Sequence, residues 1–216
     1  VDVVLAAVSQ DGNAMEFVSE AMLDDREVLL AAVRTAGDVL QFASDRLRAD
    51  GGVVRAAVAQ SGVSLEDASD ELAGDKEIVL TAVRCQPLAL QFAMEALQAD
   101  REVVLAAVGT GSLSALQFAH SSLRDDHAIV SAMIEGHFHR LREKQPFNGA
   151  SIGADQQLRE LRMHVGPKLK ADKKLWQEVH EKLVIEEARQ LKVPTLLSLA
   201  VAATATTLDH HVDPEA

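Results

Sequence analysis

Cysteine and aromatic residues are scarce in this chain of 216 residues. Its single cysteine, Cys85, excludes an internal disulfide framework and a zinc finger built on cysteines. Aromatic residues make up only 3% of the sequence and hydrophobic residues 48%, so alanine, valine and leucine must fill the core. Small side chains of this kind suit thin, closely packed helices rather than a broad core around a cofactor, and no cofactor is expected.

Catalytic motifs and long apolar runs are also missing. The sequence has no glycine-rich phosphate loop, no G-x-S-x-G or H-E-x-x-H motif and no kinase signature, so we do not expect an enzyme. The longest uncharged apolar run, Val193–Leu208, is shorter than the roughly 20 residues that span a bilayer. We interpret it as a buried terminal helix, with membrane contact through residues 193–208 as the alternative.

Histidines do not form a convincing metal site. His137 and His139 alternate, so on a helix they point to different sides, and His210 and His211 lie near the polar end of the chain. Zinc or copper needs three or four ligands that are held by a second shell of hydrogen bonds. We therefore expect no metal.

A period of 25 residues governs the first 135 positions of the sequence. Its copies begin at aspartates, and the segments Asp25–Leu47, Asp75–Leu97 and Asp100–Leu123 match most closely. One residue is inserted between Gly109 and Ser114, and a partial copy opens the chain, from which we expect a processed or partial polypeptide. A short fixed period indicates stacked copies of one supersecondary unit.

Each copy is predicted to form two short helices. The aspartate is expected to be the N-cap of a first helix over about 26–34, because its carboxylate accepts backbone N–H groups. Gly37, like Gly12 and Gly62, is expected to end that helix with a positive φ. A second helix is predicted from about Val39 to Arg48. Its buried stripe consists of Leu40, Ala43 and Leu47. Because short helices are marginal alone, they must stack, and the fold class expected is all-α, an α-solenoid of two-helix repeats.

The domain boundaries follow from the end of the period, which we place after His137. We expect a repeat array over residues 1–143, a linker over 144–154 and a C-terminal helical segment over 155–216 that caps the array or docks a partner. Helices in that last segment are predicted at Asp155–Val165, Lys168–Lys192 and Pro194–Leu208.

The copy that starts at Asp50 departs from the pattern. Gly51 and Gly52 replace Arg-Glu, Arg55 replaces leucine and Asp67 replaces phenylalanine. Each glycine costs roughly 1 kcal/mol relative to a good helix former. Neutral drift on a tolerant face and a bend or contact site are both compatible with these changes.

Negative charge is concentrated in the repeat region. Residues 1–126 carry 9 basic and 21 acidic side chains, so the whole net charge of −12 lies there. Nucleic acid is not expected as a partner, because phosphate binding needs clustered lysine and arginine. A protein with a basic surface is compatible with this charge, and a small-molecule substrate is not expected.

One acidic position recurs along the array. It is occupied by Glu20, Asp45, Asp70 and Glu95. Four residues earlier, on the same face of the predicted second helix, lie Glu16, Gln41, Glu66 and Gln91. We interpret the acidic members of both sets, together with Trp176 of the predicted basic C-terminal helix, as partner-binding candidates. The alternative interpretation is a solvated face that keeps the array soluble.

The repeated pattern D-R-E-V-V-L-A-A-V-x-x-x-G-x-A-L-Q-F-A-S-x-x-L resembles the family called domain of unknown function 4116, over residues 1 to about 134. The resemblance implies a helical repeat protein and brings no catalytic residues with it. The copy at Asp50 departs from the family pattern at Gly51, Gly52, Arg55 and Asp67.

Two hypotheses about function stay open. The first is a non-catalytic protein–protein interaction scaffold, an accessory or structural subunit of a larger assembly, with which an organellar membrane-associated setting is compatible. The alternative is a targeting or regulatory repeat region of an enzyme or effector whose catalytic part is absent from this chain. We expect an intracellular location, soluble or peripheral, and an organelle is compatible with the processed or partial start.

Overall fold

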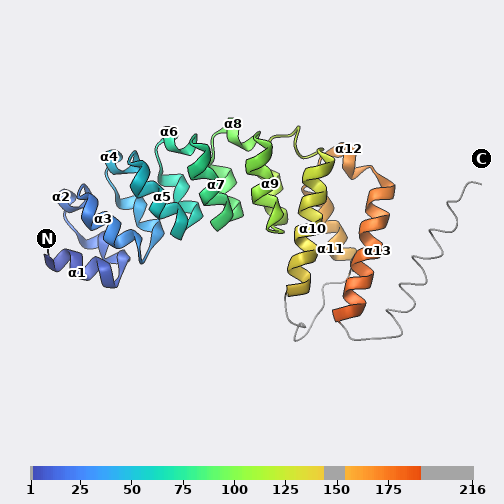
Figure 1. Cartoon of the computed structure of the whole chain (residues 1–216), viewed down its shortest axis with the longest axis horizontal. Coiled ribbons are helices and arrows are strands. Elements are labelled where there is room, and N and C mark those ends of the chain that lie inside the picture. The colour runs from blue at the N-terminus through green and yellow to red at the C-terminus, as the bar shows by residue number, and fades with distance from the viewer. Residues whose placement is uncertain (1, 144–153, 191–216) are drawn as a thin grey trace, which may run out of the picture.

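The computed structural model describes residues 2–143 and 154–190, and each regular element in these ranges is a helix. The helices follow one another in a row along the long axis of the molecule, from α1 at one end to α13 near the other (Figure 1). The predicted all-α fold class is therefore confirmed. No helix in these ranges combines the length and the apolar character needed to cross a bilayer. The predicted linker and the run Val193–Leu208 lie outside the described residues, apart from Ala154.

Each unit begins with a long α-helix, which from α3 to α10 follows the recurring aspartate. The long helices are α1 (Asp2–Gln10), α3 (Arg26–Val33), α5 (Gly51–Gln60), α7 (Lys76–Cys85), α9 (Arg101–Gly109) and α10 (His127–Glu143). Before α7, Asp75 Oδ1 accepts hydrogen bonds from Glu77 N at 2.9 Å and Ile78 N at 3.1 Å. Asp25, Asp50, Asp100 and Asp126 accept the same two bonds at their own helices. The predicted N-cap role of the aspartates is confirmed.

The rest of each unit is a 3₁₀ helix followed, in the first four units, by a four-residue α-helix; after η5, residues 121–125 form turns instead. The 3₁₀ helices are η1 (Gly12–Phe17), η2 (Gly37–Phe42), η3 (Gly62–Asp67), η4 (Pro87–Phe92) and η5 (Leu113–Phe118). The short α-helices are α2 (Glu20–Leu23), α4 (Asp45–Arg48), α6 (Asp70–Ala73) and α8 (Glu95–Gln98).

The prediction of one continuous second helix over Val39–Arg48 is wrong. Ala43 and Ser44 have extended backbone, with ψ values of 150° and 155°, and they separate η2 from α4. The break frees the Ser44 N–H to donate to Leu23 O of the preceding unit at 3.4 Å. It also exposes the carbonyl of Ala43 to Arg48 Nε, 3.0 Å away. These bonds compensate for the helical hydrogen bonds that the break removes.

The recurring glycines act through close packing and not through a positive φ. Among the described glycines, only Gly111 has a positive φ, of 79°. A Cβ built on Gly62 would lie 2.4 Å from Ala82 O of the next unit, and one on Gly37 would lie 2.8 Å from Ala57 O. The predicted reason for these glycines is therefore wrong. Each lacks a side chain because the backbone of the next long helix passes directly over it.

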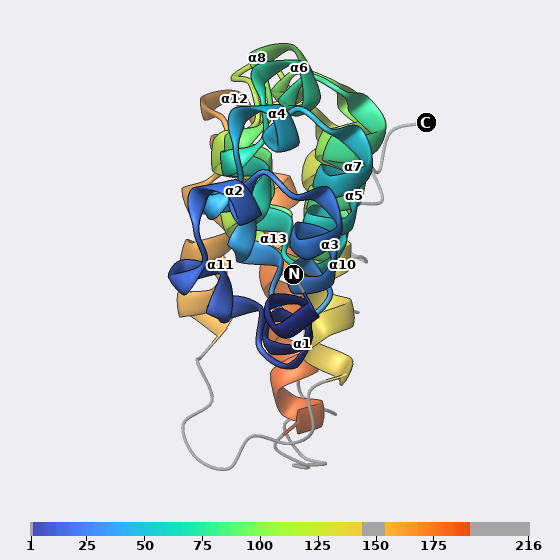
Figure 2. The same ribbon diagram turned by 90° about the vertical axis from the view of Figure 1, so that its left-hand side faces the viewer.

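The core runs through all the units as one continuous cluster. Each long helix packs on the next, and each 3₁₀ helix packs on its neighbours in the row. The predicted buried stripe is confirmed, since Leu40, Ala43 and Leu47 are all buried although they lie on different helical segments. Figure 2 views the row from its α1 end, with the short α-helices α2, α4, α6 and α8 along one edge.

A backbone hydrogen bond joins consecutive units at this edge. It runs from the residue before each short helix, or before the turn at 121–125, to the end of the short helix or turn of the preceding unit. The bonds are Ser44 N to Leu23 O, Ser69 N to Arg48 O, Met94 N to Ala73 O and His120 N to Gln98 O. The series continues with Gly166 N, which donates to Arg124 O at 2.9 Å. The C-terminal segment is thus attached to the row by the bond that joins the repeated units.

The C-terminal helices contain a further, altered unit. They are α11 (Ala154–Met163), α12 (Pro167–Lys170) and α13 (Lys173–Gln190). Asp172 precedes α13, and its Oδ1 accepts a hydrogen bond from Leu175 N at 3.0 Å, as the recurring aspartates do. The sequence P-K-L-K-A-D at 167–172 also matches D-R-L-R-A-D at 45–50. Features of the repeated unit thus recur beyond His137, although Asp172 lies outside the 25-residue period that ends there.

Helix predictions in this segment are partly correct. The predicted helix Asp155–Val165 corresponds to α11. The predicted helix Lys168–Lys192 is divided, because Ala171 and Asp172 separate α12 from α13. Buried Glu186 on α13 accepts from Arg142 Nε of α10 and Arg189 Nη1, each at 3.3 Å, and so links α13 to the array.

Candidate partner-binding surface

The acidic positions predicted from the repeat occupy the same place in four units. Glu20, Asp45, Asp70 and Glu95 are the first residues of α2, α4, α6 and α8, and all four are exposed. The first turn of a helix favours a carboxylate, because the unpaired N–H groups there carry partial positive charge. The short helices lie in a row along one edge of the molecule (Figures 1 and 2). We call these four residues the acidic row.

The second set of candidates lies on different segments. Glu16, Gln41, Glu66 and Gln91 belong to the 3₁₀ helices η1 to η4 and are exposed. An extended pair of residues separates each of them from the acidic row, so the expected spacing of one turn on one helix does not apply. Glu16 and Glu66 therefore remain exposed acids beside the acidic row without sharing its helices.

Trp176 is a core residue and is not exposed for docking. Its side chain is 4% exposed, and its Nε1–H donates to Leu169 O at 2.7 Å. The guanidinium carbon of Arg162 lies 5.5 Å from the centroid of the ring, a cation–π arrangement. These contacts give the single tryptophan of the chain a structural role, because its ring packs between α11, α12 and α13.

A second row of acids holds neighbouring units together. Arg26 Nε lies 2.8 Å from Asp50 Oδ2 of the next unit, and Lys76 Nζ lies 2.8 Å from Asp100 Oδ2. Arg101 Nε lies 3.3 Å from Asp126 Oδ2 in the same way. The hydrogen bond from the cation, together with those from the capped helix, lowers the pKa of Asp50, Asp100 and Asp126 below its usual value. Sequence reasoning missed these pairs, although a basic residue 24 or 25 positions before the next aspartate signals them.

The unit that starts at Asp50 lacks this contact. Gly51 stands where the other units have Arg26, Lys76 or Arg101, and within the described residues no cation pairs with Asp75. Helix α5 nevertheless forms over Gly51–Gln60. Asp67 replaces a half-buried phenylalanine, and its burial raises the pKa of the carboxyl, partly offset by the charge of Arg48. The altered unit therefore keeps the fold but lacks the ion pair to the aspartate of the next unit.

One further contact ties the edge that carries the acidic row. Arg46 Nε lies 3.0 Å from Asp24 Oδ1 of the preceding unit, and Ser44 Oγ donates to the same oxygen. The hydrogen bond from Ser44, followed by that from Arg46, lowers the pKa of Asp24. Arg46 is therefore already engaged by an acid, and the neighbouring Asp45 is left exposed.

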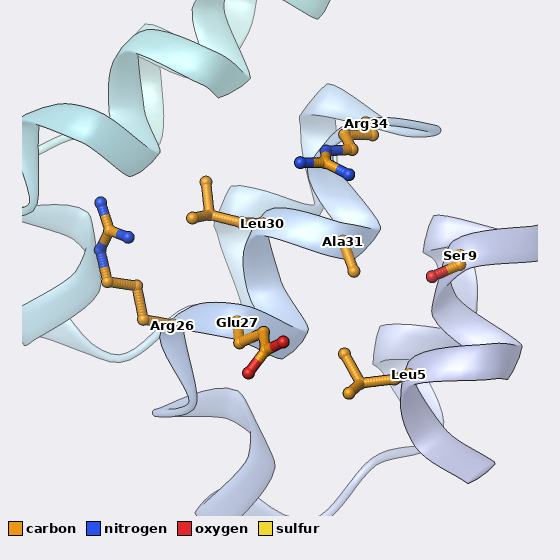
Figure 3. A pocket seen from close by; sticks show the side chains of 7 residues that line it. All are labelled: Leu5, Ser9, Arg26, Glu27, Leu30, Ala31 and Arg34. Carbon is orange, nitrogen blue, oxygen red and sulfur yellow. The ribbon is translucent and has the colours of Figure 1, made fainter. Parts of the chain in front are cut away.

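Two open grooves are present on other faces. The first, with a volume of about 570 Å³, lies between α1 and α3 (Figure 3). It is lined by Leu5, Ser9, Arg26, Glu27, Leu30, Ala31 and Arg34. The second, of about 410 Å³, is lined by the exposed Cys85 together with Arg84, Arg140 and other residues. In the described part of the chain, no three His, Cys, Asp or Glu side chains are grouped so as to hold a metal ion.

Comparison with known proteins supports the family resemblance and adds no activity. The family model described as domain of unknown function (DUF4116) matches residues 1–48 and 50–98. The predicted resemblance is confirmed over these two segments, which begin and end at almost the same points of the 25-residue period. No curated protein and no solved structure matches the chain.

Proposed function

We propose that this chain is a non-catalytic scaffold that binds a basic segment of a partner protein along the acidic row. The observation that supports this proposal is the recurrence of one exposed carboxylate on the first residue of each short helix. An extended row of this kind suits an extended partner, whereas a small molecule is bound in a concave site that buries most of its surface.

The capping aspartates and the acidic row differ in whether they form ion pairs. Asp50, Asp100 and Asp126 cap helices and pair with a cation of the preceding unit. Within the described residues, Glu20, Asp45, Asp70 and Glu95 form no ion pair. Their charge is not needed to join the units, so it remains available to a partner.

Electrostatic binding along such a row has a defined dependence on salt. Adjacent carboxylates of the acidic row belong to units whose helices pack roughly 8–10 Å apart, which is about one Debye length at 0.1 M salt. At low ionic strength, a basic partner would therefore interact with several of these carboxylates at once. Charge complementarity acts mainly on the association rate, and added salt weakens it.

The proposal is tested by removing the charge of the row without changing its shape. The variant Glu20→Gln, Asp45→Asn, Asp70→Asn, Glu95→Gln is immobilised beside the unmodified chain, and proteins captured from native extract are quantified by mass spectrometry over a series of salt concentrations. We expect the variant to lose the captured basic partner most strongly at low salt, with unchanged helicity by circular dichroism.

A matched control separates the row from overall charge. The variant Glu27→Gln, Glu77→Gln, Glu135→Gln, Glu178→Gln removes four exposed acids from long helices and leaves the row intact. It should capture the same partner as the unmodified chain. If both variants behave alike, or if the row variant captures the partner normally at every salt concentration, the acidic row is only a solvated surface.

A further inference from the structure

The end of the molecule formed by α1 has the composition of an interface between units. Val28, Val53, Ile78, Val103 and Ile129 hold one repeat position in five successive long helices, and each is at most 1% exposed. The residue at that position in α1 is Val3, which is 82% exposed. Ala7 is likewise exposed where Ala32, Ala57, Ala82 and Ala107 are buried.

The 3₁₀ helix of this unit has the same difference. Phe17 at the end of η1 is 85% exposed, whereas Phe42, Phe92 and Phe118 at the same position are half-buried. In the interior of the row, the preceding unit covers these positions, and α1 itself covers α3 in this way. Figure 2 looks at the α1 end of the row, on the side of α1 away from α3. We call Asp2, Val3, Ala7 and Phe17 the α1 end face.

Interior junctions show what kind of element covers such a face. At three junctions the preceding unit presents a glycine next to the aliphatic residues: Cβ atoms on Gly12, Gly37 and Gly62 would lie 2.5, 2.8 and 2.4 Å from the carbonyl oxygens of Ala32, Ala57 and Ala82 in the following helices. A basic residue reaches forward as well, since Lys76 Nζ lies 2.8 Å from Asp100 Oδ2 and 2.9 Å from Glu102 Oε2 of the next unit. Asp2 occupies in α1 the position that Glu102 occupies in α9.

The acidic residues near the α1 end face also restrict which element can bind there. Residues 1–25 contain six acidic side chains and no lysine or arginine. Two copies of this end brought face to face would place like charges opposite each other, which is unfavourable. An occupant that carries a lysine or arginine beside an aliphatic stripe would find an acid already in place.

We propose that the α1 end face binds one further helical unit of this same repeat type. That unit would present an aliphatic stripe to Val3, a glycine or other small residue to the backbone at Ala7, and a lysine or arginine to Asp2. The face is continuous with the junctions between units, and it has the same residue types in the same positions, so the same packing covers it.

The test adds such a unit in register. A second copy of residues 26–50, which carries Arg26 and Gly37, is joined directly before Val1, so that its last aspartate stands in the N-cap position of α1. Hydrogen exchange of the α1 amides is compared with that of a chain extended by a Gly/Ser segment of equal length. We expect exchange in α1 to slow by at least about tenfold, because packing against the added unit suppresses local opening.

Two variants and one further measurement keep the result interpretable. Val3→Asp in the extended chain should return the α1 exchange rate to that of the Gly/Ser control, and Val3→Ala should return it part of the way. Equal exchange in the extended chain and the Gly/Ser control would overturn the proposal. Sedimentation of the unextended chain should show a monomer. A dimer that Val3→Asp disrupts would assign the face to a second copy and would also overturn it.

Discussion

The repeated units and the C-terminal helices differ in what fills the space beside the long helix. In the repeated units, a 3₁₀ helix presents a buried leucine such as Leu40 or Leu90 to a core of alanine and valine. In the C-terminal segment, the α-helix α11 takes that place, and Trp176 is the large buried side chain on α13. Both regions keep the short helix, the capping aspartate and the backbone bond to the preceding unit.

The comparison distinguishes the contacts that join a unit to its neighbours from the side chains that fill the core of the unit. The backbone bond of Gly166 to Arg124 and the cap at Asp172 persist where the glycine, leucine and phenylalanine pattern is lost. Leu169 N also donates to Asp125 Oδ1 at 3.0 Å, a contact made by the C-terminal unit alone among these junctions. The geometry of the junction is therefore the same in both regions, whereas the core side chains can change as long as their total volume is retained.

The largest effect is expected at the centre of the C-terminal unit. Trp176→Ala removes a large buried side chain and the hydrogen bond to Leu169 O, and should lower the free energy of unfolding by about 3–5 kcal/mol. Urea denaturation followed by circular dichroism measures this loss. Trp176→Phe should cost less, because most of the volume is retained. An unchanged denaturation midpoint for Trp176→Ala would show that this unit does not fold together with the array.

A comparable test applies to the repeated units. Leu90→Ala should cost about 2–5 kcal/mol, because Leu90 is fully buried in η4. Gln91→Ala, one residue further along, should stay within about 0.5 kcal/mol, because Gln91 is exposed. The two denaturation midpoints are compared under the same conditions. Equal shifts would mean that the inside and outside of the 3₁₀ helix are assigned to the wrong faces.

The junction itself is tested at a glycine. Gly62→Ala would place a methyl group 2.4 Å from Ala82 O, so neighbouring units must separate, at a cost of about 1–3 kcal/mol. Gly109→Ala is the matched control, because a Cβ there meets nothing within 4 Å. That substitution should be neutral or stabilise by up to about 1 kcal/mol. Thermal unfolding distinguishes them, and a neutral Gly62→Ala would contradict the close-packing role of the glycine.

The smallest effect is expected for the ion pairs between units. Asp75→Ala and Asp100→Ala each remove a helix cap, which costs about 0.5–2 kcal/mol. Asp100→Ala also removes the partner of Lys76, so it should cost more than Asp75→Ala by up to about 1 kcal/mol. The extra cost should shrink in high salt. Equal costs at low salt would show that the pair does not stabilise the junction.

The same pair predicts a dependence on pH. The hydrogen bond from Lys76 lowers the pKa of Asp100 in the folded protein. Its stabilising contribution is therefore present above the unfolded pKa of about 3.9 and is lost as the pH falls through the lower folded pKa. The difference in unfolding free energy between Asp100→Ala and the unmodified chain should accordingly close in strongly acidic solution. A difference that stays constant down to that range would argue against the pair.

The acidic row was identifiable from the sequence because a fixed period copies a position from unit to unit. Trp176 was considered for partner binding, but its burial depends on packing between α11, α12 and α13, which the sequence pattern of its own helix does not reveal. The pairing of Lys76 with Asp100 was also missed. Its residues lie 24 positions apart, and only the stacking of units brings them together.

Local preferences within the sequence determined the all-α class, the 25-residue period, the capping aspartates and the buried stripe of Leu40, Ala43 and Leu47. These features depend on a residue and its near neighbours. The tertiary structure alone decided that Ala43 and Ser44 interrupt the second helix and that Gly62 serves close packing. Both follow from contacts with an adjacent unit, whose backbone accepts the Ser44 N–H and passes over Gly62. A hydrogen bond or a steric limit between units leaves no mark on the periodicity of either unit, so it becomes visible only when the units are stacked.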